Sequence, residues 1–198
     1  YQKKYSNIVY YQSNENKGPD RNYYNAIKIA NGEFCWLLGS DDLLTVDAIK
    51  RVKDQYIKQT PDLDFILVTS EVYDIELKKF YHYSKDELNV TEDLYYENAY
   101  DFFVRFFCES GLSGYIVRRE LWINVEYEKY LDTGLVYLGL LYEYLKPNSK
   151  ILVIEKPCII YRSGNGCWTA DLFKIQIELM RNILDSLPHH YNLYKEEA

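Results

Sequence analysis

The chain has 198 residues, 47% of them hydrophobic, which is enough for one domain with a buried core. Its net charge of -7 argues against a nucleic-acid surface, because binding a phosphate backbone requires clustered Lys and Arg residues, and the sequence has no such cluster. No apolar segment approaches the roughly 20 residues that cross a bilayer, so we predict no transmembrane helix.

The first third of the chain predicts a strand, a helix and a second strand. Residues 7–11 are β-branched and aromatic, and a loop rich in turn-forming residues follows them. Asp20 is then predicted to cap a helix, which Asn31 and Gly32 end. With the apolar residues 34–38 as its second strand, this segment is expected to form a right-handed βαβ unit.

Residues 34–38 are followed within three positions by two adjacent carboxylates, Asp41 and Asp42. An apolar run without alternation is typical of a strand in the middle of a parallel sheet, where ligands lie at the carboxyl ends of strands. Two neighbouring like charges are costly unless a cation such as a divalent metal binds them. The alternative is an exposed strand-to-helix turn in which one Asp caps the helix.

The loop around residues 17–22 is expected at the same edge of the sheet. Arg21 and the unpaired amides at the start of the helix could hold a phosphate there.

The middle of the chain predicts further alternation of helices and strands. Thr45 is expected to cap a helix that ends before Pro61, and residues 84–96 are expected to form a mobile loop. The other predicted elements are a strand at 64–69, a hairpin within 71–83, a helix from residue 97 to Phe107, a strand at 112–117 and a short helix at 119–122.

The last third predicts a helix at about 133–145, strands at 151–154 and 158–161, a compact turn at 162–166, and an amphipathic helix from Thr169 to Pro188. No repeat or linker interrupts the chain, so residues 1–198 are expected to form a single domain. The four cysteines, Cys35, Cys108, Cys158 and Cys167, are widely spaced. This spacing predicts free thiols in a reducing compartment, with neither a disulfide framework nor a zinc site.

Several of these stretches together resemble the family 2 glycosyltransferases, which have the GT-A fold. The similarity extends over nearly the whole chain. Within the family, the sequence most resembles the bacterial surface-polysaccharide, abequosyltransferase-like branch. The stretches that carry it are residues 16–18, Arg21 and Asn22, residues 30–33, residues 38–42, residues 112–119 and residues 161–165.

The resemblance implies an α/β fold with a Rossmann-like, mixed but mainly parallel sheet flanked by helices. The family normally opens with a further strand, helix and strand, so the chain is expected to be an N-terminally incomplete part of a longer protein. The implied activity is an inverting, metal-dependent transfer of a sugar from a nucleotide-diphosphate donor to a saccharide or lipid-linked acceptor in bacterial polysaccharide synthesis. The implied location is cytoplasmic, peripheral to the inner membrane.

By the same resemblance, Asp42 would bind Mg²⁺ or Mn²⁺ on the donor diphosphate, and Asp41 would contact the ribose or the metal shell. The other residues expected on the donor side are Lys17, Gly18, Arg21, Asn22 and Ser40.

The resemblance also implies that Asp132, at the start of the helix predicted near Thr133, is the catalytic base. Its other interpretation is a cap for that helix, since Asp is a preferred capping residue. Glu109, Glu126 and Glu128 are alternative bases.

Two other functions fit the same residues. One is a metal-dependent hydrolase or phosphotransferase that uses Asp41 and Asp42, although no convincing set of partner acids or lysines accompanies them. The other is a non-catalytic carbohydrate-binding or assembly module.

Overall fold

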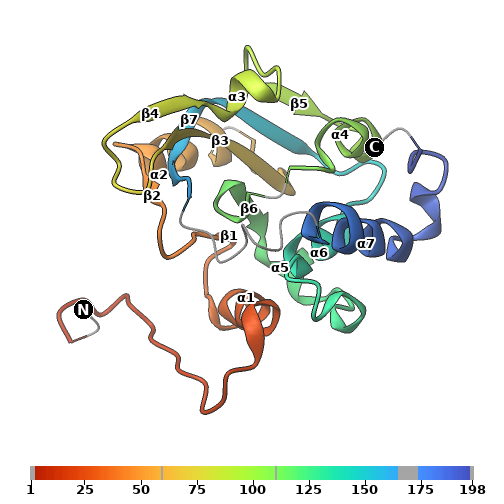
Figure 1. Ribbon diagram of the computed structural model, residues 1–198, viewed down its shortest axis with the longest axis horizontal. Coiled ribbons are helices and arrows are strands. Elements are labelled where there is room, and N and C mark those ends of the chain that lie inside the picture. Colours follow the sequence, from red (N-terminus) through yellow and green to blue (C-terminus); the bar gives the residue numbers. More distant parts are fainter. Residues whose placement is uncertain (1–2, 59, 110, 165–173, 197–198) are drawn as a thin grey trace.

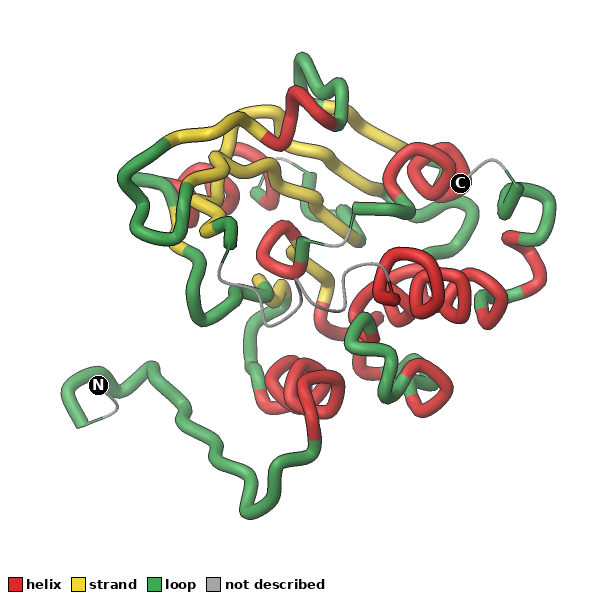
Figure 2. Tube along the Cα trace, in the orientation of Figure 1, coloured by secondary structure: helices red, strands yellow, loops and turns green. Residues whose placement is uncertain are grey.

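The computed structural model describes residues 3–58, 60–109, 111–164 and 174–196. In this part of the chain, one seven-stranded mixed sheet has helices on both faces (Figures 1 and 2). The strands follow the order β1-β6-β3-β7-β2, with β4 beside β3 and β5 beside β7. Their bounds are Phe34–Trp36 (β1), Leu43–Leu44 (β2), Phe65–Tyr73 (β3), Phe80–Tyr83 (β4), Leu94–Tyr96 (β5), Tyr115–Arg118 (β6) and Ile151–Arg162 (β7).

The two long central strands, β3 and β7, are parallel, and every other strand pair is antiparallel. The predicted α/β class with a mixed sheet is therefore confirmed, but the expectation of a mainly parallel sheet is wrong. An apolar run reports that a strand is covered on both faces, and it carries no information on the direction of the strand beside it.

β1, which precedes the two carboxylates, is the first strand in the order β1-β6-β3-β7-β2. It therefore lies at one end of this order and not in the middle of a parallel sheet. Its described partner is β6, which runs antiparallel to it. Burial alternates along the run, because Cys35 and Leu37 are buried whereas Phe34 and Trp36 are only partly covered. The position predicted for this strand is therefore wrong, although the strand itself is confirmed.

Alternate residues of β3 divide the core between the two faces of the sheet. Phe65 and Leu67 pack into a large cluster with α1, α4, α5, α6 and α7, while Ile66 and Val68 pack into a smaller cluster with α2. The α-helices are α1 (Gly18–Ile29), α2 (Ala48–Arg51), α3 (Ser84–Glu87), α4 (Ala99–Phe106), α5 (Arg119–Ile123), α6 (Val136–Tyr144) and α7 (Met180–Ser186). π-helical turns at Val52–Ile57 and Lys174–Leu179 extend α2 and precede α7, and 3₁₀ turns lie at Leu112–Gly114, Glu128–Tyr130 and His189–Tyr191.

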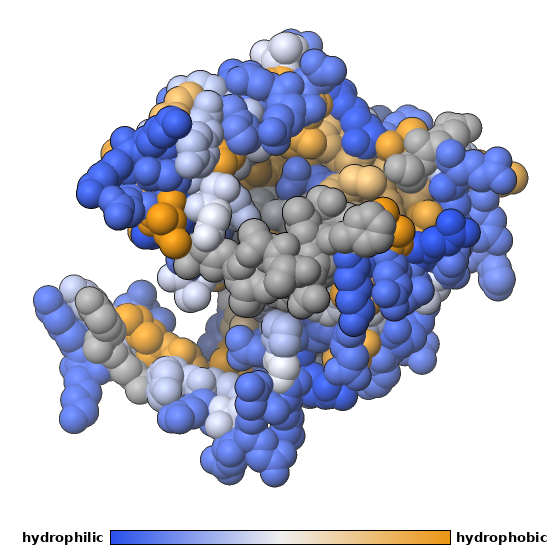
Figure 3. Space-filling model, viewed as in Figure 1, coloured by the Kyte–Doolittle hydropathy of each residue, from blue (hydrophilic) through white to orange (hydrophobic). Residues whose placement is uncertain are grey.

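The first predicted strand does not form. Residues 7–11 are exposed and belong to an extended segment that runs away from the body of the molecule (Figure 1). Apolar side chains show on the surface of this segment (Figure 3), and they include Ile8 and Val9. A β-prone sequence becomes a strand only beside a partner strand, and none of the strands in the described residues lies next to it, so the expected βαβ unit does not form there.

Two predicted helix starts are displaced. Thr45 does not cap α2, because Asp47 (φ 63°) occupies the N-cap position and the Thr45 hydroxyl instead donates to the Pro157 carbonyl. The helix predicted from Thr133 begins at Val136, with Leu135 at its N-cap position. Both starts lie near residues in left-handed conformation, which local capping preferences do not reveal.

The remaining differences concern β7 and the polar stretch at 84–96. The two strands predicted at 151–154 and 158–161 are one continuous strand, β7, which includes Pro157. The stretch at 84–96 contains α3 and β5, and β5 pairs with β7, so the expectation of a mobile loop is wrong. The hairpin expected within 71–83 is confirmed by the pairing of β3 with β4.

Cys35 and Cys158 are buried free thiols, as expected, and Cys108 is exposed. Cys167, most of the turn at 162–166 and the start of the helix predicted at Thr169 lie outside the described residues. In the ranges that are described, none of the helices combines the length and apolarity needed to cross a bilayer.

Candidate functional site

The loop after β1 holds Asp42 against Ser113, a buried residue in the 3₁₀ turn before β6. The Ser113 hydroxyl donates to Asp42 Oδ2 at 2.5 Å and accepts the Gly39 amide at 2.8 Å. The Trp36 indole donates to the Ser113 carbonyl at 2.9 Å. One serine therefore fixes both the turn and the carboxylate that follows it.

Arg162, the last residue of β7, holds the same loop from the other side. Its backbone amide donates to Asp42 Oδ1 at 3.2 Å, and its Nε donates to the Asp41 carbonyl at 3.0 Å. Its Nη1 donates to the Ile75 carbonyl at 2.8 Å. The two carboxylate oxygens of Asp42 thus each accept one hydrogen bond and keep lone pairs for a further ligand.

Burial raises the pKa of Asp42 above its ordinary value, and the neighbouring Asp41 charge adds to the rise. The hydrogen bonds from Ser113 and Arg162 oppose this shift. A cation stabilises the charged form of such a half-buried carboxylate, because it offsets both the lost hydration and the repulsion from the neighbouring negative charge.

Gly39 leaves no room for a side chain in this loop. A Cβ built there would lie 3.1 Å from Asp41 Oδ1, 3.2 Å from Asp42 Oδ2 and 3.3 Å from Ser113 Oγ. Both acid side chains therefore fold back over the backbone of Gly39, which makes them a compact pair. Asp41 and Asp42 lie side by side in a turn, and neither caps the next helix, because α2 begins at Ala48 with Asp47 at its N-cap position.

A second polar cluster surrounds the start of α1. A cavity of about 330 Å³ is lined there by Asn16, Lys17, Gly18, Arg21 and Asn22, together with neighbouring residues. Gly18 has a φ of 80°, a conformation that favours glycine, and its amide donates to Asn16 Oδ1 at 3.0 Å. The structure therefore brings together four of the residues predicted for the donor side: Lys17, Gly18, Arg21 and Asn22.

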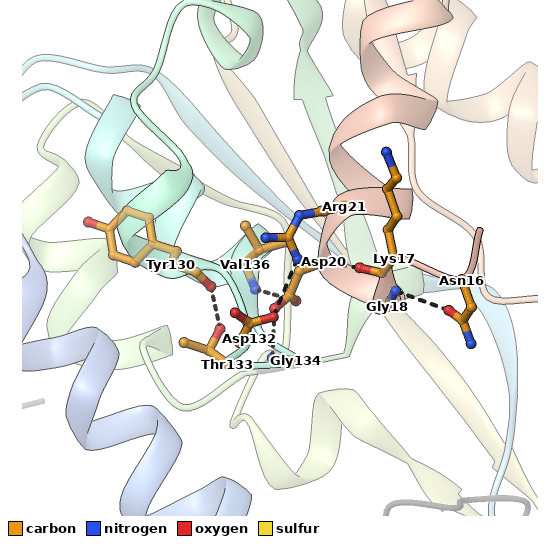
Figure 4. Close-up of polar contacts among 10 residues, drawn as sticks. All are labelled: Asn16, Lys17, Gly18, Asp20, Arg21, Tyr130, Asp132, Thr133, Gly134 and Val136. Carbon is orange, nitrogen blue, oxygen red and sulfur yellow. Dashed lines mark hydrogen bonds and ion pairs between the residues drawn. The ribbon is translucent and has the colours of Figure 1, made fainter. Parts of the chain in front are cut away.

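The same end of α1 contacts the loop before α6 (Figure 4). Arg21 Nη1 lies 3.4 Å from Asp132 Oδ1, and the Asp132 side chain is otherwise largely exposed. Asp132 does not cap α6. Instead, the carboxylate of Asp20, predicted to cap α1, accepts hydrogen bonds from the Gly134 and Val136 amides.

Two tyrosines respond to the charges of the two clusters. Burial raises the pKa of Tyr161, and the charges of Asp42 and Asp41 raise it further. Burial likewise raises the pKa of Tyr137 in α6, with smaller contributions from Tyr23, Glu109, Asp20 and Tyr161.

The alternative bases occupy different surroundings. Glu126 and Glu128 are exposed. Glu109 accepts the Gly111 amide at 2.8 Å, and burial raises the pKa of its carboxyl. Glu109 is also the alternative base whose charge raises the pKa of both Tyr137 and Tyr161.

Residue-level reasoning missed the contributions of Ser113, Arg162 and Asp20. Ser113 and Arg162 lie within stretches that support the family resemblance, and each is a polar residue at the end of an apolar run. Asp20 was interpreted as a local cap, and its partners lie more than 110 positions further along the chain. No local signal marks such a contact.

Comparison with known proteins places the chain among glycosyltransferases. It is 26% identical over 192 residues to the abequosyltransferase RfbV of Salmonella typhimurium strain LT2, covering 92% of this chain and 55% of that protein. The crystal structure of S. aureus TarS 1-349 superimposes with a TM-score of 0.58 at 16% identity, covering 91% of this chain and 50% of TarS, which supports a GT-A-like fold. The chain thus spans about half the length of these relatives.

The family match covers the Asp41–Asp42 loop, Ser113 and the α1 cavity, and it ends just before Asp132. The sequence profile described as "Glycosyl transferase family 2" matches residues 1–131, and the resemblance stated from the sequence is confirmed. The chain belongs to glycosyl transferase family 2.

Proposed function

We propose that this chain contributes to the inverting, metal-dependent transfer of a sugar from a nucleotide-diphosphate donor to a saccharide or lipid-linked acceptor in bacterial polysaccharide synthesis. The observation that carries the proposal is the orientation of Asp42 by Ser113 and Arg162, beside Asp41 in the loop after β1. Residues 1–198 act as one domain in this proposal.

The residues of this loop suit Mg²⁺ or Mn²⁺. Carboxylate oxygens are the ligands that these hard cations prefer, and Mg²⁺ in particular is commonly held by one or two carboxylates plus substrate phosphates. Within the described ranges, no group of three His, Cys, Asp or Glu residues forms a complete protein-only metal site. Asp42 and Asp41 would hold the ion together with the donor diphosphate, where it neutralises charge on the leaving nucleotide.

The α1 cavity supplies the donor side. Lys17 and Arg21 bring positive charge to a helix start, where unpaired amides and the helix dipole favour anions. Asn22 contributes a neutral donor and acceptor in the same cavity, and Ser40 lies next to the carboxylate pair. Together these groups orient the diphosphate.

Asp132 accepts the proton of the acceptor hydroxyl as this oxygen attacks the sugar carbon from the face opposite the leaving group, which inverts the configuration. Its exposed position at the edge of the α1 cavity suits contact with an incoming acceptor. Glu109 is the alternative base, supported by the raised pKa of its carboxyl and by its influence on the pKa of Tyr137 and Tyr161.

The test is calorimetry of a sugar nucleotide with and without Mn²⁺. Asp42→Asn is expected to abolish the Mn²⁺-dependent part of donor binding while the fold remains intact. Asp54→Asn is the matched control, because Asp54 forms exposed ion pairs with Lys50 and Lys58. These residues lie on α2 and the π-helical turn that follows it, on the face of the sheet that holds the smaller core cluster. Undiminished Mn²⁺-dependent affinity in Asp42→Asn would remove this residue from the metal site.

Transfer assays then separate the competing functions. Donor binding without transfer to any saccharide acceptor would favour the carbohydrate-binding module. Release of free sugar or phosphate without an acceptor requirement would favour the hydrolase.

A further inference from the structure

Asp20 is a buried carboxylate whose hydrogen bonds serve a distant segment. The residue is 3% exposed. The other buried polar residues in the described ranges, Thr69, Ser113 and Ser149, carry hydroxyl groups, so Asp20 is the one with a carboxylate. It lies in the first turn of α1, yet its Oδ2 accepts the Gly134 amide at 3.0 Å and its Oδ1 accepts the Val136 amide at 3.2 Å. Both oxygens are therefore committed to the loop that enters α6.

The start of α6 needs this partner. A helix leaves its first amides without intrahelical acceptors, and Leu135 at the N-cap position has no side chain that could accept them. A carboxylate also interacts favourably with the positive end of the helix dipole. Asp20 thus performs for α6 the capping role that was the alternative interpretation of Asp132.

The loop that Asp20 holds has a demanding backbone conformation. Asp132 (φ 64°) and Gly134 (φ 71°) both occupy the left-handed region, which is costly for a residue with a side chain. Thr133 supports the loop from within, because its hydroxyl donates to the Tyr130 carbonyl at 2.8 Å and accepts the Leu135 amide at 3.1 Å. Asp20 and Thr133 therefore hold Asp132 in a conformation that it would rarely adopt alone.

Adjacent residues of α1 contact this loop at two points. Asp20 holds its backbone, and Arg21 reaches the Asp132 side chain (Figure 4). We propose that Asp20 is a positioning residue that presents the Asp132 carboxylate at the cavity lined by Lys17 and Arg21. This inference depends on the role proposed above for Asp132 in sugar transfer.

The consequence is a direct connection between donor and acceptor sides. The first turn of α1 lines the cavity with Gly18 and Arg21 and sets the position of the base with Asp20. Donor and base are thus aligned by one turn of helix.

The test compares Asp20→Asn with wild type by two measurements. Asn keeps the size of the side chain but has one carbonyl oxygen, so it can replace only one of the two amide contacts. Hydrogen exchange in residues 131–136 should become about tenfold faster. The kcat for transfer should fall by roughly 10- to 100-fold, with the donor KM within about threefold of wild type.

A double variant shows whether Asp20 acts through Asp132. In an Asp132→Asn background, Asp20→Asn should cause no further loss of kcat, whereas an unrelated effect on the fold would multiply with the first loss. Asp101→Asn is the matched control, because Asp101 lies exposed in the first turn of α4 and should leave both measurements unchanged. If Asp20→Asn folds poorly, Thr133→Val loosens the same loop from its other anchor and should lower kcat in the same way.

Unchanged exchange in Asp20→Asn, or faster exchange with unchanged kcat, would overturn the positioning role. If Asp20→Asn folds too poorly to be measured, an unchanged kcat in Thr133→Val would overturn the positioning role. A kcat loss in the double variant equal to the product of the two single losses would also overturn it. A wild-type protein that transfers no sugar would instead contradict the proposed function, and the exchange measurement would still decide whether Asp20 holds the loop.

Discussion

Arg21 and Asp132, 111 positions apart in the sequence, meet through Nη1 and Oδ1 at 3.4 Å. The first was expected to bind the donor diphosphate and the second to act as the base. Their contact places both expected roles at one location. A phosphate that binds Arg21 would compete with Asp132 for the same guanidinium.

Replacing Arg21 by Ala should weaken donor binding by roughly ten- to a hundredfold. The reason is the loss of a charge-assisted hydrogen bond, which is worth about 1.5–3 kcal/mol. Calorimetry with the sugar nucleotide measures the effect. Lys28→Ala is the control, since Lys28 is an exposed cation in the last turn of the same helix. Equal dissociation constants for Arg21→Ala and wild type would assign Arg21 to the surface ion pair alone.

Replacing Ser113 by Ala should weaken Mn²⁺-dependent donor binding by about tenfold or more, because Asp42 loses the hydrogen bond that orients it. The free energy of unfolding should fall by about 1–3 kcal/mol, since the Gly39 amide also loses its acceptor.

Ser84→Ala provides the comparison for Ser113→Ala. It removes a hydroxyl that accepts the Ser70 amide at 2.8 Å elsewhere on the sheet, so it should lower stability without altering donor binding. Similar binding losses in the two variants would mean that the effect of Ser113 is indirect.

Replacing Gly139 by Ala should destabilise the fold. A Cβ at this position would lie 2.4–2.8 Å from three atoms of the Tyr130 ring, which is fully buried. Overpacking of this kind costs about 1–3 kcal/mol, more than the helix propensity gained by Ala. Urea denaturation measures the loss. Adding Tyr130→Leu should make the two losses clearly less than additive, and strict additivity would contradict the proposed clash.

The stability contributed by Asp20 should depend on pH. Burial raises the pKa of its carboxyl in the folded protein, against the opposing effect of its backbone hydrogen bonds. The folded state therefore binds the proton more tightly than the unfolded state. The stability of wild type relative to Asp20→Asn should rise as the pH falls through the raised pKa and level off below the unfolded value.

Denaturation of wild type and Asp20→Asn over a range of pH tests this dependence, because the other titrating groups cancel in the difference. A difference that decreases toward low pH would show that hydrogen bonding, and not burial, dominates at Asp20.

Much of the fold could be predicted because it depends on local patterns. The apolar runs at β3, β6, β7 and α6 and the helical spacing of α4 are visible in the sequence, and each element forms. Strand direction could not be predicted, because an apolar run indicates only that a strand is covered, and covered strands also occur in the antiparallel pairs of a mixed sheet. The interpretation of residues 84–96 was wrong for a related reason, since the three-residue strand β5 exists only through its pairing with β7.

The site could be predicted in part. Adjacent acids after an apolar run pointed to Asp41 and Asp42, a helix start pointed to Arg21, and the family resemblance added Lys17. The groups that orient them could not be found in this way. Ser113 and Arg162 reach Asp42 across 71 and 120 positions of sequence, and only the folded chain brings them together.

The hydrogen bond from Arg162 to Asp42 comes from the peptide backbone and not from the guanidinium. That amide is placed by the last residue pair of β7 and β3, Tyr73 with Arg162, so its direction is determined by the sheet. Asp42 would keep this donor whichever side chain occupied position 162, with proline as the exception, since proline has no amide hydrogen. Position 162 is accordingly tolerant to mutation with respect to Asp42, while the contacts to Asp41 and Ile75 depend on arginine itself.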